Sequence, residues 1–98
     1  MGPTVERAAA LWLARAVATT RNPKGRALAA TRVRTWLVPH LGCRPLRGLT
    51  GDDVRGYRLA LESRGLAPQT VVHVLSDLRA LLLWAVAEGA LARSPFPR

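Results

Sequence analysis

Arginine provides most of the chemistry that this sequence offers. The 98 residues include 15 lysines and arginines and 6 acidic residues, which gives a formal net charge of +9. All but one of the 15 cations are arginine, whose planar fork of N–H donors matches phosphate oxygens and the edge of guanine. This composition is typical of a protein that binds a polyanion, most often nucleic acid.

The positive charge is concentrated in the first half of the chain. Nine basic residues and no acidic residue lie between residues 7 and 51, whereas the rest of the chain contains six of each. The nine are Arg7, Arg15, Arg21, Lys24, Arg26, Arg32, Arg34, Arg44 and Arg47. A GC-rich coding sequence would also raise the arginine and alanine content and would explain why arginine outnumbers lysine. It would not explain the missing acids.

Residues suited to catalysis or metal binding are few and scattered. Cys43 is the single cysteine, which excludes an internal disulfide and a multi-cysteine zinc site and fits a loop residue better than a reactive thiol. His40 has no second His and no carboxylate near it in sequence, and no Gly-rich phosphate loop occurs. Tyr57 lies between Val54 and Leu61 at helical spacing, which predicts a core side chain. We expect no cofactor, no metal and no catalytic residue.

The longest helical pattern predicts a helix over residues 68–88, with Pro68 in its first turn and Gly89 just past its end. The apolar stripe that predicts its buried side consists of Val71, Val74, Leu75, Leu78, Leu81, Leu82 and Ala85. The first half carries polar residues on the opposite side, namely Gln69, His73 and Ser76. The second half is apolar on every side, so we expect it to be buried nearly all round.

Three shorter helices are predicted over residues 5–18, 26–38 and 51–64. Thr4 and Thr50 precede the first and the third as N-caps, and Asp53 completes a capping box with Thr50. The second is expected to stop before Pro39, because proline disfavours helical geometry in the residue before it. The corner over residues 38–50 is too rich in Pro and Gly for regular structure. No strand is predicted, so the sequence indicates an all-α, compact four-helix bundle.

The second helix and the loop before it present a polar, basic strip. On a helical wheel Arg32 and Arg34 lie about 100° to either side of the apolar stripe, since successive residues turn by that angle. The predicted DNA-binding residues are Arg21, Lys24, Arg26, Thr31, Arg32, Arg34, Thr35, Gln69, Thr70 and His73. The alternative is that these arginines are ordinary solvated flanks of the helix.

An ordered set of short signals runs through the second half of the chain. Its members are Pro39, Leu41, Gly42, Arg44, Pro45, Leu46, Leu49, Thr50, Asp53, Val54, Gly65, Leu66, Pro68, Thr70, Leu75, Ser76, Leu78, Arg79, Trp84, Ala85, Gly89 and Pro95. The order resembles the N-terminal core-binding domain of tyrosine recombinases, the phage-integrase family. The resemblance covers about residues 4–95, and the ordered set carries it rather than any single motif.

The resemblance implies a SAM-like bundle that forms the non-catalytic half of a two-domain enzyme. In that family the two domains clamp a DNA duplex from opposite sides, and the second and fourth helices of this domain commonly approach the DNA. It therefore implies one core-binding domain over residues 1–98, with the bundle over 4–95 and the start of a linker to a missing catalytic domain at 96–98. The implied partners are double-stranded DNA and other recombinase protomers on DNA, with a monomer in its absence.

The resemblance also carries individual positions. Thr70 matches a Thr or Ser near the start of the family's fourth helix, and His73 stands where Arg or Asn is common. Ala67 stands where Ser often caps the fourth helix and Gly25 where Thr often opens the second, so both helices are expected to begin without a hydroxyl cap. The family's catalytic domain uses a tyrosine nucleophile with two arginines, His and Lys. Because this chain has no His-x-x-Arg sequence and only one tyrosine, Tyr57, we expect DNA binding without enzymatic activity.

Two further expectations concern location and an alternative function. No uninterrupted apolar run approaches the roughly 18 residues needed to cross a bilayer, and the N-terminus carries Glu6 and no cleavage-type arrangement. We therefore expect a cytoplasmic protein with no membrane partner. The alternative function is a helical protein–protein interaction module without specific DNA binding, because Val72, Leu83 and Trp84 lie off the main apolar stripe.

Overall fold

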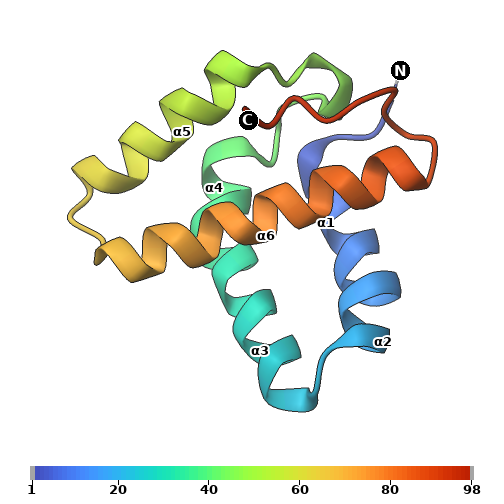
Figure 1. Ribbon diagram of the computed structural model, residues 1–98, viewed down its shortest axis with the longest axis horizontal. Coiled ribbons are helices and arrows are strands. Elements are labelled where there is room, and N and C mark those ends of the chain that lie inside the picture. Colours follow the sequence, from blue (N-terminus) through green and yellow to red (C-terminus); the bar gives the residue numbers. More distant parts are fainter. Residues whose placement is uncertain (1, 98) are drawn as a thin grey trace.

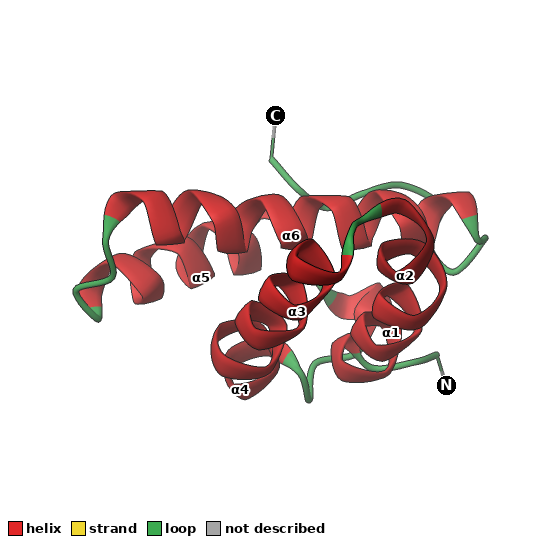
Figure 2. Ribbon diagram, turned by 90° about the horizontal axis from the view of Figure 1, so that it is seen from below, coloured by secondary structure: helices red, strands yellow, loops and turns green. Residues whose placement is uncertain are grey.

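Two crossing units of helices make up the computed structural model, which describes residues 2–97. Met1 and Arg98, the outermost residues of the predicted domain and linker, lie outside the described residues. One unit is a hairpin of two long helices from the first half of the chain, and the other is the pair α5 and α6, of which α6 crosses the hairpin (Figures 1 and 2). The predicted all-α bundle is confirmed: among the described residues the extended structure amounts to one isolated bridge.

The first long helix runs two residues further than predicted. It comprises α1 (Val5–Trp12), a π-helical turn η1 (Leu13–Val17) and α2 (Ala18–Thr20). Thr4 caps its start as predicted, because its hydroxyl accepts a hydrogen bond from the N–H of Arg7 at 3.2 Å. The hydroxyl of Thr20 donates to the carbonyl of Ala16 at 2.7 Å and helps to end the helix.

The second long helix begins earlier than the predicted residue 26. It comprises α3 (Pro23–Arg32), a π-helical turn η2 (Val33–Leu37) and α4 (Val38–Leu41). Asn22 caps it, since its side-chain oxygen accepts a hydrogen bond from the N–H of Gly25 at 2.7 Å. Pro23 suits the first position, where its missing N–H is not needed. The helix therefore opens before Gly25 and has a side-chain cap, which a carboxamide provides and not a hydroxyl.

Pro39 does not end the second helix, contrary to the prediction. It lies inside α4, directly after the π-helical turn η2, where the N–H of Val38 bonds to the carbonyl of Val33, five residues back. A proline in an α-helix lacks an N–H and crowds the carbonyl four residues earlier. In the π turn an N–H bonds to the carbonyl five residues back and not four. Such turns are a recognised way for a helix to continue through a residue that does not fit the regular α-helical pattern, here the proline.

The corner after α4 fastens the N-terminus to the base of the hairpin. The N–H of Val5 donates to the carbonyl of Arg44, and the N–H of Leu46 donates to the carbonyl of Pro3, both at 2.9 Å. A short 3₁₀ turn, η3 (Leu46–Gly48), follows where irregular structure was predicted. Backbone hydrogen bonds thus close the hairpin at the end opposite its tip.

Helix α5 (Gly51–Ser63) follows the predicted pattern and ends one residue earlier. Thr50 and Asp53 form the predicted capping box in both directions, at 2.9 and 3.1 Å. Gly65 has a φ of 77°, a left-handed conformation that glycine adopts without strain at a helix end. Leu66 then packs against the core, as expected for the residue after such a cap.

Helix α6 (Pro68–Ala87) is the longest element and begins without a side-chain cap at Ala67, as the resemblance implied. Gly89 ends it with a φ of 83°. Its buried residues are Val71, Val74, Asp77, Leu78, Leu81, Leu82 and Ala85. The second half is not buried all round as predicted, because Leu83 is 51% exposed.

The core lies where α6 crosses the hairpin and α5. Its largest fully buried side chains are Leu37, Leu46, Leu61, Leu78, Leu81, Leu82, Val5, Val17 and Val74. The C-terminal segment runs back between α5 and α6 (Figure 1), and Phe96 packs partly buried against the core. The bundle therefore extends into the residues predicted to begin a linker, as far as the described chain reaches.

Helix α6 is also long and apolar enough, by length and composition, to span a membrane. Asp77 and Arg79 interrupt its apolar sequence, so it contains no uninterrupted apolar run of that length. The central helix of a water-soluble bundle has the same composition, and here α6 has seven buried positions, one of which is the charged Asp77.

We predict that Tyr57→Phe destabilises the protein by about 1 kcal/mol, the usual net value of a partly buried hydrogen bond. The hydroxyl of Tyr57 donates to the carbonyl of Trp36 at 2.7 Å, which joins α5 to the π turn η2. The measurement is the free energy of unfolding in urea. Ser63→Ala, which removes an exposed hydroxyl bonded within its own helix, is the control and should change that free energy less.

Candidate nucleic-acid interface

Asp77 is the one buried charged side chain among residues 2–97, with 3% of its surface exposed. Arg32 of α3 forms two hydrogen bonds with its carboxylate: Nε donates to Oδ2 at 2.6 Å and Nη2 donates to Oδ1 at 3.2 Å. A buried carboxylate is costly unless it is paired and hydrogen-bonded, and the two-pronged arginine contact meets both needs. The hydrogen bonds to Asp77 also raise the pKa of Arg32 above its usual value, so the guanidinium stays charged.

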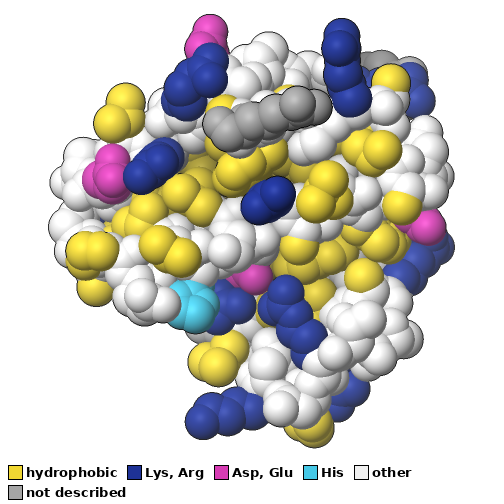
Figure 3. Space-filling view, viewed as in Figure 1, with side chains coloured by type: hydrophobic (Ala, Val, Ile, Leu, Met, Phe, Trp, Pro, Cys, Tyr) yellow, Lys and Arg dark blue, Asp and Glu magenta, His cyan; other side chains and the backbone are white. Residues whose placement is uncertain are grey.

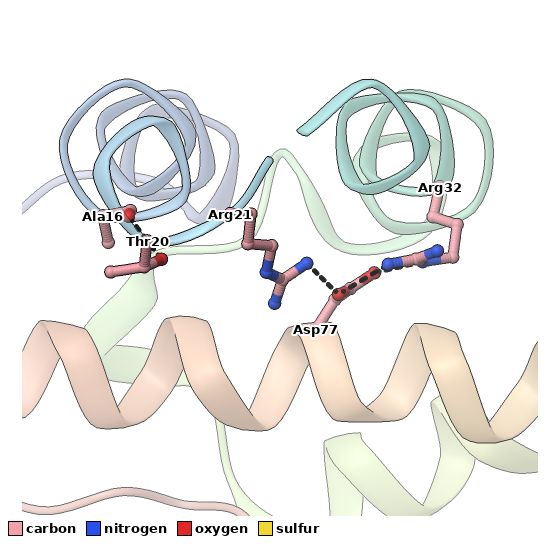
Figure 4. Close-up of polar contacts among 5 residues, drawn as sticks. All are labelled: Ala16, Thr20, Arg21, Arg32 and Asp77. Carbon is pink, nitrogen blue, oxygen red and sulfur yellow. Dashed lines mark hydrogen bonds and ion pairs between the residues drawn. The ribbon is translucent and has the colours of Figure 1, made fainter. Parts of the chain in front are cut away.

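Arg21 approaches the same carboxylate from the loop between α2 and α3. Its Nη1 lies 3.5 Å from Asp77 Oδ1, and a third of its side chain is exposed. Its guanidinium carbon also lies 5.5 Å from the ring centre of Trp12, within the range of a cation–π contact. Figure 4 shows the two arginines converging on Asp77 from the two arms of the hairpin, above α6.

The tip of the hairpin carries further cations. Lys24 and Arg26 are exposed at the start of α3, and Arg26 Nη1 donates to the carbonyl of Ala18 at 3.1 Å across the tip. This bond satisfies one of the carbonyls that the end of α2 leaves without a helical partner. Arg26 therefore has a structural contact, while Lys24 extends into solvent.

One side of α3 and η2 is exposed along its whole length. Lys24, Leu28, Thr31 and Thr35 follow one another at spacings of four, three and four residues, which places them on one face of a helix. All four are exposed, and Leu28 is 49% exposed. The polar strip predicted for Thr31 and Thr35 is therefore present.

Arg34 does not share a surface with Arg32. It lines a shallow groove between α1 and the second long helix, together with Glu6, Ala10 and Val38. No residue of α6 contributes to this groove, whereas Arg32 faces Asp77 of α6. The predicted arrangement of two guanidinium groups flanking one threonine strip is thus divided between two surfaces.

The first turns of α6 present the predicted polar residues. Gln69 Nε2 and His73 Nε2 lie 3.0 Å apart, and both side chains are exposed. Thr70 is half-buried. Because His73 precedes Asp77 by four residues, the two lie on neighbouring parts of the same helix face. The Gln69–His73 pair is therefore next to the arginines that hold Asp77.

Most arginines of α5 and of the corner after α4 form ion pairs with acidic residues. Arg44 bonds to Asp53 at 2.9 Å, and the backbone N–H of Thr50, followed by this contact, lowers the pKa of Asp53. On α5, Arg55 pairs with Asp52 and Arg58 lies 3.7 Å from Glu62. On the face seen in Figure 3, basic side chains outnumber acidic ones and surround the lower part, over the hairpin.

Within residues 2–97, the side chains that catalysis or metal binding would require do not gather at one place. Among the described residues no group of three or more His, Cys, Asp or Glu is placed to hold a metal ion, and Cys43 is free and exposed. Tyr57 is buried at the core as predicted. Burial raises its pKa far above the usual value, which leaves the phenol protonated and unsuited to act as a nucleophile.

The structure thus brings Arg21 and Arg32 together at Asp77, with His73 one helical turn before Asp77 on α6, and it places Arg34 in a separate groove. Asp77 was not predicted as a functional or a buried residue, and its two arginine contacts are a finding of the structure. A signal was present: Val74, Asp77 and Leu81 follow the i, i+3, i+7 spacing of a buried stripe, and an acid at such a position needs a basic partner.

Comparisons with protein-family models, with curated proteins and with solved structures gave no match.

We predict that Arg32→Ala lowers the free energy of unfolding by about 2 kcal/mol, because it leaves Asp77 buried without its two hydrogen bonds. Arg21→Ala should cost less than about 1 kcal/mol, as expected for a longer and partly exposed ion pair. Urea unfolding followed by circular dichroism measures both. Equal losses of unfolding free energy for the two variants would contradict the inference that Arg32 stabilises the fold more than Arg21 does.

Proposed function

We propose that this chain is a DNA-binding domain that holds duplex DNA along its helical hairpin. The charge of the hairpin carries this proposal: its two long helices and the loop between them, residues 5–41, contain seven basic residues and one acidic residue, Glu6, a net charge of +6. A single-sign surface of this strength attracts a polyanion and speeds its association. On DNA such a surface binds phosphates and releases counterions.

Two sets of residues would act differently on the duplex. Lys24, Arg21 and Arg26 at the tip, with the exposed threonines of α3, suit phosphates, which fix position without reading sequence. The Gln69–His73 pair suits base edges in a groove, because a carboxamide can bond two positions of adenine. The net charge of α6 is close to zero, so attraction comes from the hairpin and any reading of bases from α6.

We further propose that the parent protein is a tyrosine-type recombinase or integrase, in which a separate catalytic domain carries out DNA integration or recombination. The ordered residues that resemble the core-binding domain of that family support this. Their places in the fold are compatible with it, since Thr50 and Asp53 form a helix cap, Gly65 and Gly89 end helices, and Leu78 is buried. In that setting the domain acts in the cytoplasm and has no catalytic role of its own.

A helical interaction module remains the second candidate, and one observation favours it. Val72 and Leu83 on α6 are 56% and 51% exposed, and an apolar groove between α5 and α6 is lined by Leu66, Val71, Val72 and Leu75 among others. Val72 lines this groove, and Leu83 lies eleven residues further along α6. An exposed apolar groove is a usual mark of a protein contact. A recombinase protomer would use such a surface beside its neighbour on DNA, so the two candidates are compatible.

We predict that the isolated domain binds duplex DNA weakly, with log K falling against log salt concentration at a slope of about −4 to −5 if about five phosphates are neutralised. Fluorescence anisotropy with a labelled duplex between low and moderate salt measures this slope. A slope near zero, or no binding at low salt, would contradict the proposal. Sedimentation without DNA should show a monomer mass that does not change with concentration, whereas self-association would favour the interaction module.

We predict that Gln69→Ala changes sequence preference more than total affinity, because the lost contact is to bases rather than to phosphate. Binding to a random duplex should stay within about twofold, while the preference among selected duplexes weakens by about tenfold for one bidentate pair. Ser76→Ala, also exposed on α6, is the matched control. An equal loss on all duplexes would place Gln69 on the phosphate backbone instead.

A further inference from the structure

The two arginines at Asp77 are bound unequally, and the difference suggests different roles. Arg32 uses two nitrogens and occupies both carboxylate oxygens, at 2.6 and 3.2 Å, with 21% of its side chain exposed. Arg21 reaches one oxygen, at 3.5 Å, with 33% exposed. The contact of Arg21 is therefore longer than an ordinary hydrogen bond. It is also not needed to provide Asp77 with hydrogen-bond donors, because Arg32 already bonds to both carboxylate oxygens.

One third of the Arg21 side chain is exposed to solvent, so its guanidinium can reach a ligand. It lies just past the end of α2, with extended backbone angles, and the solvent-exposed Lys24 follows three residues later. The ring of Trp12 under its guanidinium limits the positions that the side chain can take. Because Arg32 already neutralises Asp77, the carboxylate attracts a second cation only weakly. A phosphate in direct contact would attract Arg21 more strongly.

We propose that Arg21 exchanges Asp77 for a phosphate of the DNA backbone, while Arg32 stays on Asp77 and holds α6 against the hairpin. This rests on the proposed DNA binding and deepens it, because it makes Arg21 the phosphate-binding residue and Arg32 a positioning residue. Asp77 and the DNA phosphate then compete for one guanidinium group (Figure 4). The carboxylate keeps Arg21 near the interface in the absence of DNA.

The first test compares Arg21→Ala with a charge-matched control on the same labelled duplex. Arg58→Ala removes an exposed arginine from α5 that pairs only with Glu62. Arg21→Ala should bind about tenfold more weakly, as for the loss of one charge-assisted contact, and its salt slope should be about 0.9 smaller. Arg58→Ala should change affinity less than about twofold, as expected for a charge away from the interface. Equal effects of the two variants would overturn the proposal.

The second test addresses the competition. Asp77→Asn should bind the duplex more tightly than wild type and more tightly than Asp52→Asn, which removes an exposed acid elsewhere. In the double variant with Arg21→Ala this gain should disappear, because the guanidinium that Asp77 restrains is no longer present. A folded Asp77→Asn protein that binds no more tightly than Asp52→Asn would contradict the competition. If Asp77→Asn does not fold, the comparison of Arg21→Ala with Arg58→Ala decides alone.

The outcomes separate this inference from the proposed function. Wild-type protein that fails to bind duplex at low salt contradicts both. Wild-type protein that binds, with a steep salt slope and equal losses for Arg21→Ala and Arg58→Ala, supports DNA binding and overturns the role of Arg21. Circular dichroism of each variant confirms that it is folded, so a loss of binding reports on the contact.

Discussion

One buried carboxylate determines how the two units of this protein meet. Asp77 lies at the crossing of α6 over the hairpin, and its charge requires basic partners at that depth. Apolar packing alone is non-directional, so leucines and valines would tolerate several crossing positions of α6. The planar contact between Arg32 and Asp77 has a defined geometry and spans 45 residues of sequence. It therefore sets the position of α6 along the hairpin, and with it the distance between the polar turns of α6 and the basic tip.

The same contact divides the arginines into two groups. An arginine-rich segment suggests a uniform cationic surface, yet Arg32 and Arg26 have intramolecular partners and Arg34 lies in a different groove. The excess charge is still present, because one carboxylate cannot offset a whole hairpin. Intramolecular contacts and the proposed DNA binding thus draw on the same residue type at neighbouring positions. Charge counts from sequence consequently overstate the number of guanidinium groups that are free for phosphate.

Much of the fold could be predicted from the sequence because its signals are local. The Thr50–Asp53 cap, the glycine ends at Gly65 and Gly89, and the extent of α6 all depend on residues within one turn of each other. Two features resisted prediction for a physical reason. The passage of the helix through Pro39 depends on a π turn that no residue type marks, and the pairing of Asp77 depends on tertiary contact. The wheel placed Arg32 and Arg34 correctly relative to the stripe but could not show which neighbour each one meets.

The two ends of the hairpin are held by different forces. Backbone hydrogen bonds from Val5 and Leu46 close its base, whereas Arg21 beside the tip and Arg32 midway along the second long helix contact Asp77 of α6. Salt screens the longer, partly exposed contact of Arg21 more than the buried pair of Arg32 and Asp77, and it leaves backbone hydrogen bonds nearly unchanged. Ionic strength therefore acts mainly on the loop at the tip, through the contact between Arg21 and Asp77. The base of the hairpin keeps its geometry as the salt concentration rises, while the loop at the tip becomes more mobile.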